Sequence, residues 1–148
     1  MEFITVEQFK EQTEEVQKVF LDWWKCEPFN IYAWCWNLKD NKWSIESCCN
    51  QIQADTINKG KTIGNIIPLF TEGQLRKFIE DKESCLLDIK VENLHDNYND
   101  YTVIGWEINR FEYGIEFGRI LFEDCIKAKD LLQLYWKVAC MIAKEEMK

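Results

Sequence analysis

Residues 101–118 read YTVIGWEINRFEYGIEFG, and this stretch decides the fold because its alternation separates the two faces of a predicted β-hairpin. The strands are expected over Tyr101–Ile108 and Phe111–Gly118, with a turn at Asn109-Arg110. In that register one face is apolar and belongs to the core. Its cross-strand pairs are Ile104 with Ile115, Trp106 with Tyr113 and Ile108 with Phe111.

The opposite face of this hairpin combines bare and charged positions. Gly105 is expected opposite Gly114, which leaves a strip without side chains. Beside this strip Glu107 is expected opposite Glu112, and like charges in direct cross-strand pairs lower stability. The face is therefore the candidate partner-binding site, and its residues are Tyr101, Val103, Gly105, Glu107, Glu112, Gly114 and Glu116.

Two interpretations of that face stay open. In the first, a helix of the same domain covers the glycine strip, and Lys90 of the preceding strand neutralises the glutamates. In the second, the face is exposed, and a partner places a strand, a helix or basic side chains against it, which relieves the charge repulsion.

Apolar periodicity predicts three helices. They span Thr5–Lys25, Glu72–Asp81, and a final segment that starts between Asp124 and Asp130 and ends near Glu146. Thr5 with Gln8, and Thr71 with Gln74, have the spacing of capping boxes. The apolar stripe of the last helix comprises Ala128, Leu131, Leu132, Tyr135, Val138, Ala139 and Ile142.

Another hairpin is predicted before the second helix, with strands Phe29–Leu38 and Trp43–Cys49. Its polar turn, residues 39–42, sets a register that places Trp36 opposite Ile45 and gives one aromatic face, which we expect in the core. Residues 50–64 lack a sustained period and are expected to form a loop. Alternation over Cys85–Glu92 predicts one further strand.

Strands in hairpin pairs indicate an α+β fold, with an antiparallel sheet of about five strands and helices packed on it. The predicted element order is α-β-β-α-β-β-β-α. A chain of 148 residues fits a single globular domain, 1–148. The pattern leaves open whether the two hairpins share one sheet.

The formal net charge of −8 opposes contact with phosphate backbones, so nucleic acid is not expected as a direct ligand. This charge is compatible with a basic protein partner, but many soluble cytosolic domains are this acidic for solubility alone. The N-terminus lacks the basic region of a secretory signal, and no segment has the about 20 apolar residues of a membrane helix. We expect a cytoplasmic protein that does not contact a membrane.

The sequence does not predict an enzyme. Its one histidine, His95, has no nearby nucleophile to activate. Glu107, Glu112 and Glu116 could supply an acid/base pair for glycoside hydrolysis, but nothing else predicts a sugar-binding cleft. No phosphate-binding glycine motif occurs. Seven cysteines without a C-x-x-C pair predict free thiols and no metal site, and we expect no cofactor.

Three segments carry a resemblance: residues 67–82 (IPLFTEGQLRKFIEDK), residues 130–140 (DLLQLYWKVAC) and residues 19–24 (VFLDWW). They resemble segments of small uncharacterised proteins encoded by phages and prophages of clostridia. The resemblance covers about a third of the chain, mainly its helices. It implies an accessory protein of a phage, acting in the host bacterial cell.

The resemblance favours one function over two alternatives. The leading hypothesis is a non-catalytic, anti-CRISPR-like inhibitor of a host defence system, which occupies a basic surface of a host protein that itself binds nucleic acid. The first alternative is a protein that sequesters a small molecule or nucleotide signal, which would need convergent basic side chains; the chain has only Arg76, Arg110 and Arg119. The second is a structural or assembly accessory protein of the phage.

Overall fold

The computed structural model describes residues 1–91, 101–110, 116–120, 127–128 and 130–147. The fold is α+β, as predicted. Two sheets replace the predicted sheet of about five strands, and the chain divides into two compact units, described separately below. One unit comprises Phe3–Phe70 with the chain from Ala143 onward, and the other comprises Thr71–Ile142. The single domain over 1–148 stays a prediction.

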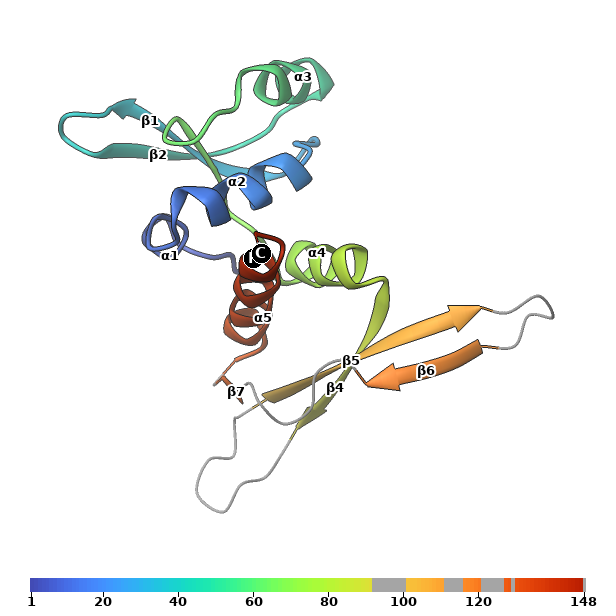
Figure 1. Cartoon of the computed structure of the whole chain (residues 1–148). Helices are drawn as coiled ribbons and strands as arrows, with labels where there is room; N and C mark the ends of the chain where they lie inside the picture. Colours follow the sequence, from blue (N-terminus) through green and yellow to red (C-terminus); the bar gives the residue numbers. More distant parts are fainter. Residues whose placement is uncertain (92–100, 111–115, 121–126, 129, 148) are drawn as a thin grey trace. The chain divides into compact units, whose positions relative to one another are not determined.

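Helices lie before and after the first hairpin in the first unit (Figure 1). Its elements are α1 (Val6–Lys10), α2 (Glu14–Trp23), β1 (Ile31–Asn37), β2 (Lys42–Ser47), α3 (Gln51–Gly60) and β3 (Ile66–Pro68). The strands form an antiparallel sheet in the order β2-β1-β3, so β1 is hydrogen-bonded along both edges.

The helix predicted over residues 5–25 is two helices. Its predicted capping box is confirmed, because the Thr5 hydroxyl accepts from the Gln8 N–H and the Gln8 amide oxygen accepts from the Thr5 N–H. A second N-cap follows at Thr13, whose hydroxyl accepts from the Val16 N–H at 3.3 Å. Thr13 has extended dihedrals, as an N-cap residue does, so it ends the first helical segment and starts another.

Aromatic side chains form the centre of the first unit. The ring centroids of Phe9 and Phe20 lie 6.1 Å apart, and those of Phe20 and Phe70 lie 5.6 Å apart. Trp23 adds a fourth ring, 6.0 Å from Phe70. The Ile4 N–H donates to the Phe70 carbonyl at 3.0 Å, which fixes the N-terminal segment beside this cluster.

The predicted register of the first hairpin is wrong. Ile45 pairs with Ala33, not with Trp36 as predicted. Trp36 is the extra residue of a bulge that lies between Cys35 and Asn37. The cause is local, because the Asn37 side chain accepts from the Asp40 N–H at 3.2 Å and the turn therefore begins at Asn37. Leu38, which was predicted as the end of the strand, belongs to this turn.

A helix, α3, occupies residues that were predicted as a loop. The Asn50 side chain caps it by accepting from the Gln53 N–H at 2.9 Å, and the Gln53 amide oxygen accepts from the Cys49 N–H at 2.7 Å. These two bonds resemble a capping box, and the spacing Asn50-x-x-Gln53 is the sequence signal that could have predicted the helix.

The second unit contains the other sheet. Its elements are α4 (Glu72–Glu83), β4 (Cys85–Val91), β5 (Tyr101–Arg110), β6 (Glu116–Ile120), β7 (Lys127–Ala128) and α5 (Leu131–Glu145) up to Ile142. The strands run antiparallel in the order β4-β5-β6, with β7 paired to β5. The predicted capping box of α4 is confirmed by reciprocal bonds between Thr71 and Gln74 at 3.0 and 3.4 Å.

The final helix begins within the predicted range, and the Asp130 carboxylate caps it by accepting from the Gln133 N–H at 2.8 Å. Most of the predicted stripe is buried, whereas Leu131 is half-buried. Leu134 and Trp136 are buried as well, so the buried surface of the helix is wider than the predicted stripe.

Replacing Leu132, which is buried, should destabilise the protein strongly. Leu132→Ala removes buried methyl groups and leaves a cavity, which costs about 2–5 kcal/mol of unfolding free energy. Lys144→Ala, at an exposed position of the same helix, should cost less than about 0.5 kcal/mol. Urea unfolding followed by circular dichroism measures both values, and equal values would show that the buried face is assigned incorrectly.

Candidate functional site

The predicted partner-binding face lies on β5 and β6 of the second sheet. Tyr101, Val103, Gly105 and Glu107 belong to β5, and Glu116 is the first residue of β6. Glu112 and Gly114 lie outside the described residues. The structure therefore places part of the predicted site on the middle strand, which pairs with β4 on one edge and with β6 and β7 on the other.

The predicted register of this hairpin is also wrong. The β6 residue opposite Glu107 is Arg119, and the residue opposite Glu116 is Arg110. The strand continues through Arg110 instead of turning at Asn109-Arg110. This register pairs residues of opposite formal charge, whereas the predicted one paired two glutamates.

The other predicted pairs of this face change with the register. Gly105 pairs with Leu87 of β4, and Tyr101 pairs with Val91 of β4 and Ala128 of β7. Lys90 pairs with Thr102, whereas the β4 residue opposite Glu107 is Cys85. The backbone register thus does not pair Lys90 with Glu107.

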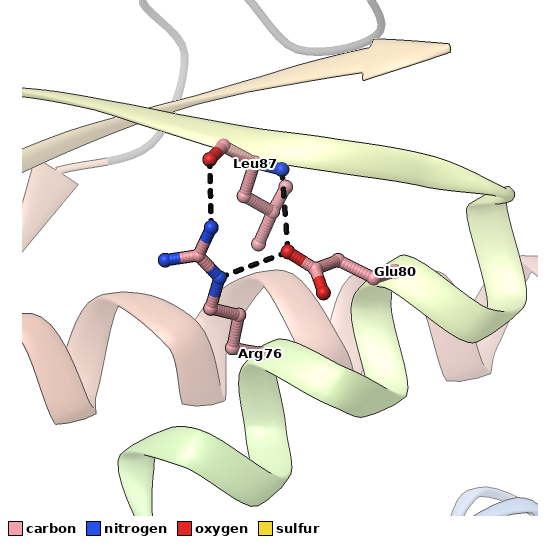
Figure 2. A network of polar contacts seen from close by, with 3 residues as sticks. All are labelled: Arg76, Glu80 and Leu87. Atoms are coloured by element: carbon pink, nitrogen blue, oxygen red, sulfur yellow. Dashed lines mark hydrogen bonds and ion pairs between the residues drawn. The ribbon is translucent and has the colours of Figure 1, made fainter. Parts of the chain in front are cut away.

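Side chains of α4 close part of the free edge of β4 (Figure 2). Arg76 donates to the Leu87 carbonyl at 3.1 Å and to the Glu80 carboxylate at 2.8 Å, and the Leu87 N–H donates to the same carboxylate at 3.4 Å. Both backbone groups of Leu87 therefore point away from β5 and are satisfied by an ion pair. The hydrogen bond to Glu80 raises the pKa of Arg76, so the guanidinium stays charged.

This ion pair should contribute more to stability than its exposed neighbour on α4. Arg76→Ala removes two hydrogen bonds to partly buried groups, which costs about 1–3 kcal/mol. Lys77→Ala removes an exposed ion pair with Asp81, which is worth less than about 1 kcal/mol. Thermal unfolding of the two variants in parallel checks this, and equal losses would contradict a structural role for the Arg76 contacts.

The first hairpin exposes four large apolar side chains that were expected in the core. We call Trp34, Trp36, Leu38 and Ile45 the hairpin surface; their exposed fractions are 39%, 56%, 76% and 57%. The bulge at Trp36 and the turn at Leu38 remove these two residues from the ordered ladder. Only the inner residues Tyr32 and Ala33 of β1 are buried.

The turn before β1 exposes a further aromatic ring, and the residue that carries this ring has a strained backbone conformation. The Asn30 N–H donates to the Glu27 carbonyl at 3.1 Å, and Pro28 and Phe29 are the central residues of the turn. Phe29 has φ of 73°, a value that a type II turn normally assigns to glycine. A bulky residue there costs about 1–2 kcal/mol, yet the Phe29 ring is 78% exposed.

Tyr32 fixes α3 on one face of the first sheet. Its hydroxyl donates to the Glu46 carboxylate at 3.2 Å and accepts from the Gln53 side-chain amide at 2.9 Å. Burial, together with the adjacent Glu46 carboxylate, raises the pKa of Tyr32 to about 12. The hydroxyl therefore stays protonated at neutral pH and remains a donor.

Two open pockets occur in the described part of the first unit. One, of about 410 Å³, is lined by Lys18 and Lys61 among others. Lys18 pairs with Asp22, and Lys61 donates to the carbonyls of Leu21 and Trp24 at the end of α2. These cations thus have partners within the protein, which does not favour a nucleotide site.

The second pocket, of about 440 Å³, lies between α1 and β2. Its lining includes Val6, Trp43 and Ile45, so it adjoins the hairpin surface. Lys10 of α1 lies over the Trp43 ring, with its ammonium 5.6 Å from the ring centroid. Apolar side chains and one cation–π contact thus lie where α1 faces β2 of the first sheet.

The cysteines differ in environment. Cys26 and Cys48 are buried, whereas Cys49 is exposed, and all three are free. Burial, with the neighbouring Cys48, raises the pKa of Cys26 to about 12. No group of three or more histidine, cysteine, aspartate or glutamate side chains suited to a metal ion occurs among the described residues.

Thiol labelling should distinguish these cysteines. The thiolate is the reactive form, so a Cys26 pKa of about 12 leaves this thiol protonated at pH 8, and burial shields it further. Iodoacetamide should therefore modify Cys49 well before Cys26 in the folded protein. Peptide mass spectrometry measures both rates, and urea-unfolded protein is the control in which the difference should vanish. Comparable rates in the folded protein would contradict the buried environment of Cys26.

No helix in the described residues is long and apolar enough to cross a membrane. Comparisons with known proteins give no match to a protein-family model, to a curated protein or to a solved structure.

Proposed function

We propose that this protein is a non-catalytic, phage-encoded inhibitor of a host defence system, anti-CRISPR-like, which works in the host cytoplasm by binding a host protein. The hairpin surface carries this proposal. Four large apolar side chains at one hairpin, two of them tryptophans, are exposed. Trp34 pairs with Ser44 and Ile45 pairs with Ala33, so these two side chains lie on opposite faces of the hairpin. Trp36 and Leu38, at the turn end of the hairpin, therefore form the centre of the proposed contact, and tryptophan is enriched among the residues that dominate binding energy.

The charge of the chain supports a basic surface as the target. Thr71–Ile142 contains 14 acidic and 9 basic residues, and the whole chain has a net charge of −8. A field of this sign accelerates encounter with a basic protein and repels nucleic acid. A host protein that binds nucleic acid presents such a basic surface, and an acidic protein can compete for it.

The strain at Phe29 supports the same proposal. A glycine would relieve the backbone at this turn, and a polar side chain would remove the exposed ring. Retaining a strained backbone and an exposed phenyl ring together costs stability without a packing gain, which is typical of residues kept for contact with a partner.

The β5 and β6 residues of the predicted site stay a prediction. In the described register Glu107 pairs with Arg119 and Glu116 pairs with Arg110, so neither glutamate lies across from another. The hairpin surface is therefore the main contact with the host protein in this proposal.

Capture from a host lysate tests the proposal. Tagged protein should retain a nucleic-acid-binding defence complex, identified by mass spectrometry, and Trp36→Ser with Leu38→Ser should weaken its affinity about tenfold or more. Ile52→Ser is the matched control, because Ile52 is 80% exposed on α3 and lies outside the hairpin. Melting temperatures should be unchanged in both variants.

A functional assay decides between this proposal and the alternatives. Expression of the protein should raise the plating efficiency of a phage that the defence system restricts, and the Trp36/Leu38 double variant should lose this effect. Capture of virion components would instead indicate an assembly role. Protection from the defence system without any captured protein would indicate sequestration of a small-molecule signal.

A further inference from the structure

Strand β2 is an edge of the first sheet, and its hydrogen-bonding direction follows from the other strands. On β1 the Cys35 N–H donates to Asn65 and the Ile31 carbonyl accepts from Leu69, so these residues point toward β3. By alternation, Tyr32 and Trp34 point toward β2. Their partners on β2 are Glu46 and Ser44, so those two residues point toward β1.

The remaining residues of β2 therefore direct their backbone groups away from the sheet. Trp43 and Ile45 each present an N–H and a carbonyl at this edge, whereas the Ser47 carbonyl accepts from the Cys49 thiol at 3.7 Å. In contrast to β4, where Arg76 and Glu80 occupy the groups of Leu87, the outward N–H and carbonyl groups of Trp43 and Ile45 have no hydrogen-bond partner within the described residues. An open edge of this kind is a template for another strand.

The sequence of β2 is complementary to itself when read in the opposite direction. In an antiparallel pair of two copies centred on Ser44, Lys42 lies across from Glu46 of the second copy and Trp43 lies across from Ile45. These are an opposite-charge pair and an aromatic–β-branched pair, both favourable across strands, and twofold symmetry repeats each of them.

The backbone phase fits the same register. Trp43 and Ile45 both point outward, so each can exchange two hydrogen bonds with its counterpart, whereas Ser44 faces Ser44 at the symmetry axis without a backbone bond. Shifting the register by two residues places Ser44 across from Glu46 or from Lys42 and removes both opposite-charge pairs. One register thus satisfies charge, packing and hydrogen bonding together.

We propose that two copies of this protein associate through their β2 edges, antiparallel and centred on Ser44, which joins two three-stranded sheets into one of six strands. Ile45, which is 57% exposed in one copy, is covered by Trp43 of the other. The contact is small compared with a standard interface, so the dimer should be weak, with a Kd of about the micromolar range. This inference does not depend on the proposed function.

A charge-swap experiment tests the register. Lys42→Glu places two like-charged pairs across the symmetric contact, and Glu46→Lys does the same with lysines. Because Glu46→Lys also removes the acceptor of the Tyr32 hydroxyl, circular dichroism and the melting temperature show first that each variant keeps its fold. Each single variant should raise the dimer Kd about tenfold or more, and the double variant should restore it, because the opposite pairs are exchanged. Sedimentation velocity over a concentration series measures the Kd. Lys59→Glu, at an exposed site on α3, makes the same charge change as Lys42→Glu and should leave the Kd unchanged.

A backbone variant tests the edge independently. Ile45→Pro removes an N–H that points out of the sheet, so it should abolish the dimer, while circular dichroism shows that the fold is kept. Ile45→Val keeps this N–H and should keep the dimer. A wild-type protein that is monomeric up to submillimolar concentration would overturn the proposal, and so would a dimer that none of these variants weakens. Failure of the double swap to restore a dimer weakened by both single variants would overturn the register centred on Ser44.

Discussion

The alternation of hydrogen-bonding direction along a strand is the constraint on which the first unit depends. Strand β1 is hydrogen-bonded along both of its edges, and Ala33 is paired with Ile45 on one side and with Ile67 on the other. Pro68 is compatible with β3 because it pairs with Tyr32, whose backbone groups face β2, so its missing N–H leaves no bond unmade. Within the described residues, the same alternation leaves the outward groups of Trp43 and Ile45 on β2 without a partner strand.

The two sheets treat their edges differently. At β4 an ion pair from α4 takes up both backbone groups of Leu87, which blocks strand addition at that position. Along β2, Lys42 and Glu46 are placed symmetrically about Ser44, and so are Trp43 and Ile45. An antiparallel second copy of this strand would therefore meet opposite charges and apolar partners. The unpaired backbone groups of an edge strand are thus blocked by side chains at β4, whereas at β2 the sequence is complementary to a second copy of itself.

Stability and exposure are unevenly distributed in the first hairpin. Its inner half is buried and fixed by Tyr32, which bonds to both Glu46 and Gln53. Its outer half carries a bulge and exposed tryptophans, and the preceding turn holds Phe29 in a left-handed conformation. The inner half thus supplies a rigid base, and the outer half presents apolar groups that the core does not use.

The sequence by itself determined the features that depend on local bonds. Thr5 with Gln8 and Thr71 with Gln74 form the predicted capping boxes, because each bond closes within three residues. Asp130 starts the last helix for the same reason. The α+β class was also predictable, since strand and helix periods differ along the chain.

Only the tertiary structure decided the registers and the candidate site. A slip of an odd number of residues in a strand pair moves side chains to the opposite face, and local pattern leaves such slips open. In the first hairpin the local bond from Asp40 to Asn37 sets the turn, but the bulge at Trp36 is defined only against β2. In the other hairpin the register pairs Glu107 with Arg119, which lie far apart along the chain. Exposure of Trp36 follows from the register of the first hairpin, because a bulge depends on the partner strand and cannot be read from one strand alone.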